Sequence, residues 1–73
     1  METVDSGQRS FANRGKRRRA VKRLLIQLEQ IRDAEERYRD RIPENLRDAS
    51  AYDMADESVD MLSYAIDSLE SAY

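Results

Sequence analysis

The sequence predicts an all-α fold, an antiparallel two-helix hairpin of the coiled-coil type. Two long stretches of the 73-residue chain carry apolar residues at alternating steps of three and four. That is the spacing with which one α-helix contacts another. A single proline, Pro43, stands between the two stretches and blocks helix continuation. Two helices of similar length joined by one short break form an α-hairpin.

The second stretch predicts a helix over residues 50–72, around which the rest of the chain is organised. Its repeat is apolar throughout and comprises Tyr52, Ala55, Val59, Leu62, Ile66, Leu69 and Tyr73. Small residues one heptad apart lie beside it at Ala51, Ser58, Ala65 and Ala72. Small side chains let two helix backbones approach closely. We therefore expect this helix to pack tightly against a neighbour.

The first stretch predicts a helix over residues 16–41. Its repeat comprises Val21, Leu24, Leu28, Ile31, Tyr38 and Ile42, and Leu25 widens the stripe. Glu35 fills the one gap in the repeat. A carboxylate there is costly unless it reaches solvent or a partner such as Arg32 or Arg39. A polar residue on such a seam can also fix register and oligomeric state.

Residues 42–49 form the predicted turn. Pro43 pushes Ile42 out of the α region and can itself begin a short helical turn that extends to residue 48. Ser50 followed by Asp53 resembles a capping box, so the second helix should start near Ser50. Pairing Ile42 with Tyr52 places the two repeats in register, with Leu28 beside Ile66, Val21 beside Tyr73 and Glu35 near Val59.

Residues 1–15 hold both glycines and several small polar residues without periodicity, and they predict a flexible N-terminal arm. Phe11 is the only phenylalanine of the chain. It is either a lone apolar residue of the arm or an anchor that packs locally or on a partner.

Basic residues are concentrated at the start of the first helix. This basic block comprises Lys16, Arg17, Arg18, Arg19, Lys22 and Arg23. Cations at a helix N-terminus oppose the helix dipole. In the hairpin they would lie beside Asp67 and Glu70, and each end would offset the other. The alternatives are a phosphate-binding patch for nucleic acid and, more weakly, a membrane surface, although no aromatic residue interleaves the block for base stacking.

The second helix has the opposite charge. Its acidic face comprises Asp53, Asp56, Glu57, Asp60, Asp67 and Glu70, and no basic residue lies beyond residue 50. Such a run is often a solvated face. A row of carboxylates on a rigid helix can also imitate the phosphates of a nucleic acid and bind a basic groove. A carboxylate metal site formed by Asp53, Glu57 and Asp60 is a third interpretation, although we predict no bound metal.

Met54, Met61 and Tyr64 lie outside the main repeat and predict a secondary apolar edge. They would either enlarge the core under a further helix or a second copy, or bind a different protein, because methionine suits adaptable contacts. Both interpretations require another chain. A 73-residue chain without disulfides or metal also tends to need a partner for stability. The hairpin should therefore be completed by dimerisation or by a partner.

Composition argues against catalysis. The chain has no histidine to act as a base near neutral pH and no cysteine nucleophile, and it lacks a glycine-rich phosphate loop. We expect no enzyme activity, no cofactor and no small-molecule substrate. No apolar run is long enough to span a membrane, and no apolar signal segment follows the N-terminal residues. The expected location is the cytoplasm.

One segment of the chain carries a resemblance. The run LEQIRDAEERY at residues 28–38, the PENL of residues 43–46 and the acidic helix ending AIDSLESA at residues 65–72 resemble a group of tiny helical proteins carried by bacterial mobile elements and their hosts. The likeness spans residues 24–72 and brings no catalytic or binding residue with it. It implies a setting, because phage- and plasmid-borne proteins of this size are often regulators or inhibitors of host machinery, anti-CRISPR proteins among them.

The sequence thus predicts a non-catalytic protein–protein interaction module. Its specific form is a mobile-element-type regulator or inhibitor, anti-CRISPR-like, of a nucleic-acid-handling complex. It would act through the acidic face, the basic block or both. The alternatives are direct nucleic-acid binding through the basic block and a structural helical oligomer.

Overall fold

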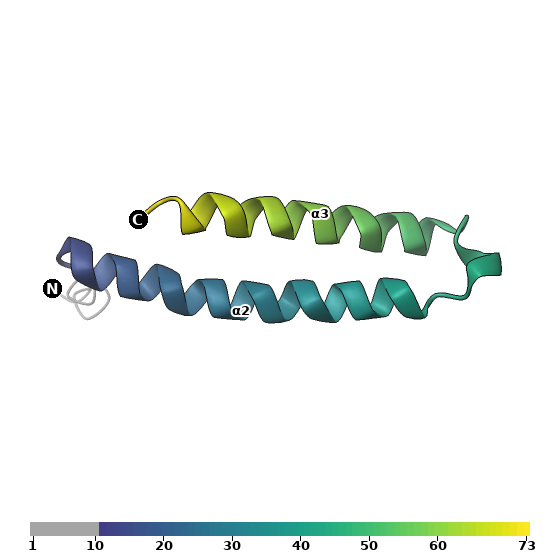
Figure 1. Cartoon of the computed structure of the whole chain (residues 1–73), viewed down its shortest axis with the longest axis horizontal. Coiled ribbons are helices and arrows are strands. Elements are labelled where there is room, and N and C mark those ends of the chain that lie inside the picture. Colours follow the sequence, from purple (N-terminus) through teal and green to yellow (C-terminus); the bar gives the residue numbers. More distant parts are fainter. Residues whose placement is uncertain (1–10) are drawn as a thin grey trace, which may run out of the picture.

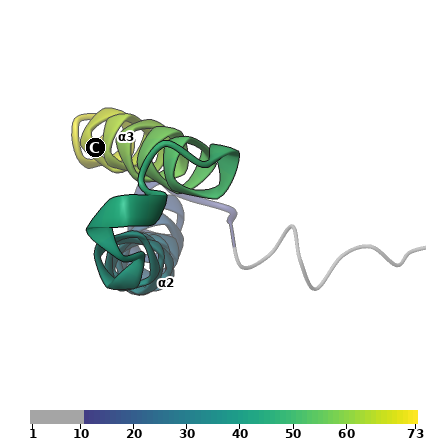
Figure 2. The ribbon, with the colours of Figure 1, turned by 90° about the vertical axis from the view of Figure 1, so that its right-hand side faces the viewer.

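Two helices lie side by side and antiparallel in the computed structural model, which describes residues 11–73 (Figure 1). Helix α2 spans Arg14–Arg41, a single 3-10 turn η1 spans Glu44–Leu46, and helix α3 spans Ser50–Glu70. The hairpin measures 56 × 27 × 14 Å, and the view along its axis shows α3 stacked on α2 (Figure 2). The predicted all-α hairpin is confirmed, and no strand occurs between residues 11 and 73.

Helix α2 starts two residues before the predicted residue 16 because Asn13 caps it. The Asn13 backbone is extended, and its side-chain oxygen accepts a hydrogen bond of 2.8 Å from the backbone N–H of Lys16. This is the standard way to satisfy a free N–H group at a helix start. The predicted arm over residues 1–15 is therefore too long, since Arg14 and Gly15 belong to α2. Residues 1–10 lie outside the described part of the chain.

The turn follows the constraints that proline imposes. Ile42 is extended, with φ −69° and ψ 123°, as expected for a residue before proline. The Leu46 N–H then donates to the Pro43 carbonyl at 2.8 Å, which closes the predicted short helical turn. Arg47 connects this turn to the residue that follows α2 and to α3. Its Nε donates to the Ile42 carbonyl at 3.2 Å, and its guanidinium lies 5.4 Å from the centre of the Tyr52 ring.

The predicted capping box at the start of α3 is wrong. Ala49 occupies the N-cap position, with an extended backbone and no side-chain hydrogen bond, and Ser50 is already helical. The physical reason is the preceding turn, because the Ala49 N–H donates to the Leu46 carbonyl at 3.0 Å and the helix begins directly after it. At its other end α3 stops at Glu70, two residues before the predicted residue 72.

The core consists of the predicted α3 repeat. Ala55, Val59 and Ile66 are 2%, 7% and 2% exposed. Tyr52, Leu62 and Leu69 are half-buried around them. Tyr73 follows the end of α3 and is 41% exposed, yet it lines a cavity with Val21, Leu25 and Leu69. That cavity confirms the predicted pairing of Val21 with Tyr73.

The predicted α2 repeat is only partly correct. Leu24, Ile31 and Tyr38 are each at least half exposed. Leu25, Arg32 and Arg39 are half-buried instead, together with the correctly predicted Val21, Leu28 and Ile42. Arginine can occupy such positions because its aliphatic stem covers apolar surface while its guanidinium reaches outward.

Glu35 remains at the middle of the hairpin and is half-buried. Its two expected partners bind other carboxylates: Arg32 pairs with Asp33 at 3.2 Å, and Arg39 pairs with Asp56 at 2.8 Å. No ion pair of Glu35 occurs within residues 11–73. Its carboxylate is only half-buried, so it keeps access to solvent.

Candidate binding surfaces

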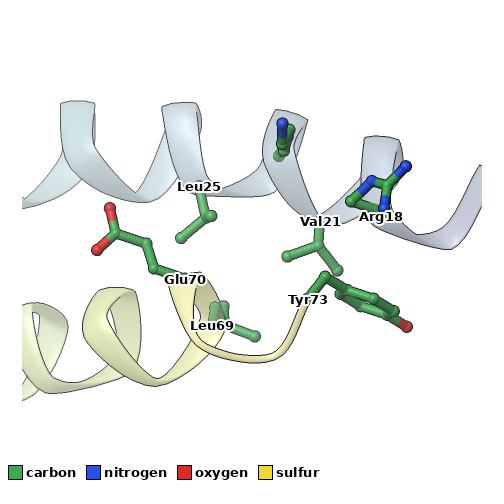
Figure 3. A pocket seen from close by; sticks show the side chains of 7 residues that line it. Arg18, Val21, Leu25, Leu69, Glu70 and Tyr73 are labelled. Atoms are coloured by element: carbon green, nitrogen blue, oxygen red, sulfur yellow. The ribbon is translucent and has the colours of Figure 1, made fainter. Parts of the chain in front are cut away.

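The two helices share a charged face, and the cavity at the open end of the hairpin identifies it. Arg18 and Lys22 of α2 and Glu70 of α3 line this cavity, beside the apolar pair Val21 and Leu69 (Figure 3). Residues on these flanks of α2 and α3 therefore lie on the same side of the hairpin. We call this side, which carries Arg18, Lys22 and Glu70 at the open end, the charged face.

Arg39 holds the charged face together near the turn. Its guanidinium contacts Asp56 of α3 at 2.8 Å and Asp40 and Glu36 of its own helix at 3.1 and 3.7 Å. The side chain of Arg39 is only 18% exposed. Its hydrogen bond to Asp40, and to a smaller extent its hydrogen bond to Asp56, raise the pKa of Arg39, although burial alone would lower it. The ion pair between Arg39 and Asp56 is the one that joins α2 to α3 in the part of the chain that the structure describes.

The predicted acidic residues of α3 remain on the surface. Of the six, Asp56 is half-buried, whereas the other five are exposed: Asp53, Glu57, Asp60, Asp67 and Glu70. No ion pair involves these five within the described residues. Successive members of the row Asp53, Asp60 and Asp67 are seven residues apart, which is about 10.5 Å along a helix. Asp60 and Asp67 line an open depression with Ser63 and Tyr64.

A second acidic row, which was not predicted from the sequence, lies on α2. Its members are Glu29, Asp33, Glu36 and Asp40. The steps of four, three and four place them on one side of α2. That side is the charged face, because Glu36 and Asp40 contact the same guanidinium as Asp56. The spacing was present in the sequence, but arginines interleave these acids and conceal the row.

The basic block occupies the first turns of α2, and its six members are exposed. Arg17 donates a hydrogen bond of 3.0 Å to the Phe11 carbonyl. Arg14 extends the block by one residue, and its guanidinium lies 4.8 Å from the centre of the Tyr73 ring. Arg18 and Lys22 share a cavity with Glu70, yet no ion pair within 4.0 Å joins them among residues 11–73. Arg18 and Lys22 are both exposed at this end of the hairpin.

The predicted apolar edge is part of a larger surface. Met54 and Met61 are 66% and 60% exposed. At about 100° per residue, they lie on the flank of α3 away from Glu70. Leu24, Ile31 and Tyr38 lie, by the same geometry, on the flank of α2 away from Arg18 and Lys22. The side opposite the charged face therefore carries an apolar face of five large side chains: Leu24, Ile31, Tyr38, Met54 and Met61.

Tyr64, the third predicted member of the edge, lies between the two faces. It is 71% exposed and lies one helical turn from Met61. It also lines the depression that contains Asp60 and Asp67. Phe11 adds to the apolar side, where it lines a shallow pocket with Ala20 and Leu24.

The described residues contain neither a metal site nor a membrane-spanning helix. Between residues 11 and 73, no three acidic side chains are arranged to hold a metal ion, which includes the set Asp53, Glu57 and Asp60. Neither α2 nor α3 has the length and apolar character needed to cross a membrane.

Comparison with protein-family models, with curated proteins and with solved structures finds no match for this chain.

Proposed function

We propose that this chain is a non-catalytic binding module that docks its charged face onto a basic groove of a nucleic-acid-handling protein and so regulates or inhibits that protein. One observation carries the proposal: two rows of carboxylates, one on each helix, lie on the same side of the hairpin. The row on α3 is free of ion pairs at Asp53, Asp60 and Asp67 within the described residues. Fixed, unpaired carboxylates attract a basic surface and accelerate association with it.

The shape of the molecule supports the same function. Interaxial distances between packed helices are about 8–10 Å, so the two carboxylate rows run side by side as two edges. The α3 edge has unpaired carboxylates within the described residues, whereas three carboxylates of the α2 edge are paired with Arg32 or Arg39. A basic groove that binds nucleic acid is built to receive two such edges. A regulator of the kind carried by mobile elements, including an anti-CRISPR-like inhibitor, could occupy the groove in place of the nucleic acid.

The test neutralises part of one row. Asp60→Asn with Asp67→Asn should abolish capture of the partner from a lysate of the native host, while circular dichroism and the urea midpoint stay unchanged. Asp53 is left intact because it lies in the first turn of α3, where a negative charge stabilises the helix. The matched control is Glu44→Gln with Asp48→Asn, which removes the same charge from the turn. The wild-type chain should capture at least as much partner from a nuclease-treated lysate as from an untreated one, because nucleic acid competes for the groove.

Two results would contradict the proposal. One is an unchanged complex with the Asp60 and Asp67 variant. The other is equal loss with the control variant, which would indicate an effect of net charge and not of the charged face.

A second candidate function is direct nucleic-acid binding through the basic block. It is favoured by the exposure of Arg18 and Arg19 at the start of α2. Duplex DNA or RNA should then be retarded at about 50 mM salt, and log affinity should fall with log salt by about 0.9 per phosphate neutralised. Arg18→Ala with Arg19→Ala should remove the retardation, whereas the matched pair Arg37→Ala with Arg41→Ala should not. Absence of retardation at low salt contradicts this function.

A further inference from the structure

The apolar face has no cover within the described residues. Its five large side chains are all at least half exposed, whereas the whole interface between α2 and α3 buries only Ala55, Val59 and Ile66. Five large apolar side chains gathered on one side of a protein of this size mark an interaction surface. Methionine, leucine and isoleucine are side chains of helix–helix cores, so the matching partner is another pair of helices.

We infer that a second copy of this chain covers the apolar face, with the turn of one hairpin over the open end of the other, to form an antiparallel four-helix bundle. This inference does not depend on the proposed function, because it uses the opposite face and leaves both charged faces outward. Two further observations identify the occupant and its direction, one from charge and one from size.

The charge observation is a strong polarity along the hairpin. The open half, residues 11–28 and 62–73, carries seven basic and two acidic side chains. The turn half, residues 29–61, carries eleven acidic and five basic side chains. A head-to-tail pair places each basic half over an acidic half. A pair with both turns at the same end would place like charges together, which costs affinity.

The size observation comes from α3. In the head-to-tail arrangement each α3 lies against its partner copy in reverse order, so the turn half with Met54 and Met61 meets the half with Ala65 and Ala72. Large residues then lie against small ones, which lets the layers of a core interdigitate. On α2, a two-fold axis at Ile31, the middle one of the three α2 residues in the apolar face, places Ile31 against its own copy and Leu24 against Tyr38.

The area of the face is also sufficient. Helix α3 has 21 residues. At about 1.5 Å per residue, and two helices or about 20 Å wide, the face covers about 600 Å² on each copy. Stable protein interfaces bury about 800 Å² per partner on average. A pair of hairpins is therefore within the range of weak to standard dimers, and dissociation should occur within an accessible concentration range.

The first experiment is sedimentation equilibrium of the full chain from 1 to about 300 μM. We expect the mass to rise from that of the 8.5 kDa chain to twice that value. Ile31→Glu should keep the chain monomeric at every concentration. The matched control is Ile26→Glu, because Ile26 is also on α2 and is 56% exposed, close to the 54% of Ile31, but lies off the apolar face. A wild-type chain that stays monomeric, or a control that dissociates equally, overturns the inference.

The second experiment tests the direction. The chain has no cysteine, so single cysteines report only the contact at which they are placed. Ile31→Cys alone should form a disulfide-linked dimer on mild oxidation. Leu24→Cys alone should not, but it should crosslink to Tyr38→Cys when the two variants are mixed. The dimer should also weaken several-fold between 0.05 and 0.5 M salt. Strengthening with salt, or crosslinking of Leu24→Cys to itself, overturns the head-to-tail direction.

Discussion

At the scale of single residues, very few side chains hold the hairpin closed. Ile66 is 2% exposed and is the largest of the three residues that are buried between positions 11 and 73. A domain of this size has only about 3–5 kcal/mol of stability from its core. Each buried methyl group is therefore a substantial share of the total.

Ile66→Val tests how much a buried side chain contributes to stability. Removing one buried methylene should lower the free energy of unfolding by about 0.5–1.5 kcal/mol. Ile26→Val is the control, since Ile26 is 56% exposed and the change should stay within about 0.5 kcal/mol. Urea unfolding followed by circular dichroism, at one fixed protein concentration, gives both values. Equal effects of the two substitutions would mean that Ile66 is not in the core.

Arg39 is the second critical residue, and its role depends on shape as well as charge. Its planar guanidinium contacts three carboxylates, which a lysine ammonium cannot match. Arg39→Lys should therefore lower the urea midpoint, whereas Arg37→Lys on the exposed side of α2 should not. If the two variants unfold at the same midpoint, the contacts of Arg39 add nothing to stability.

The pH dependence of this contribution follows from the raised pKa of Arg39. A base with a raised pKa in the folded state stabilises the fold at every pH below its ordinary titration range, and the contribution is lost only as the pH rises through the folded-state value. The Arg39→Lys difference should therefore be the same at pH 7 and pH 9. A difference that shrinks within that interval would contradict the assignment.

At the scale of elements, the two helices are capped unequally. Asn13 caps α2 through its side chain, whereas Ala49 leaves the first N–H groups of α3 without a side-chain acceptor. Ala49→Asp should raise the free energy of unfolding by about 0.5–2 kcal/mol, because the extended backbone of Ala49 is already that of an N-cap residue.

Ser50→Ala provides the control for this prediction. Because Ser50 is helical and caps nothing, its replacement should change the unfolding free energy by less than about 0.5 kcal/mol. Urea titrations of both variants distinguish the observed cap from the capping box that the sequence suggested. A loss of about 1 kcal/mol on Ser50→Ala, without a gain on Ala49→Asp, would restore Ser50 as the cap.

The helices, the proline turn and the α3 repeat could be predicted because each depends on local spacing. The side of α2 that contacts α3 could not. Two rows at heptad spacing compete for this contact: one begins at Leu24 and continues with Ile31 and Tyr38, and the other begins at Leu25 and continues with two arginines. The sequence alone favours the first row because all its members are apolar. The choice is made by a non-local contact, the guanidinium of Arg39 with Asp56. For the same reason, the acidic row of α3 was foreseen and the row of α2 was not.

At the scale of the whole molecule, stability should be unevenly distributed along the hairpin. The turn end is fastened by η1 and by Arg39, whereas the first turn of α2 has no acidic residue and the last turn of α3 has no basic one. Hydrogen exchange should therefore be slowest for the amides of residues 55–66 and fastest in the first turns of α2. Uniform exchange along both helices, followed by mass spectrometry or NMR, would contradict this gradient.

Helix α2 has 28 residues and α3 has 21, so the first turns of α2 project beyond the end of α3 (Figure 1). In a head-to-tail pair these two cationic tips would point in opposite directions, more than about 40 Å apart. Such an assembly would be bivalent. A long polyanion held at one tip would meet the other at a raised effective concentration, so that two weak contacts could act as one strong one, whereas a short oligonucleotide would gain nothing.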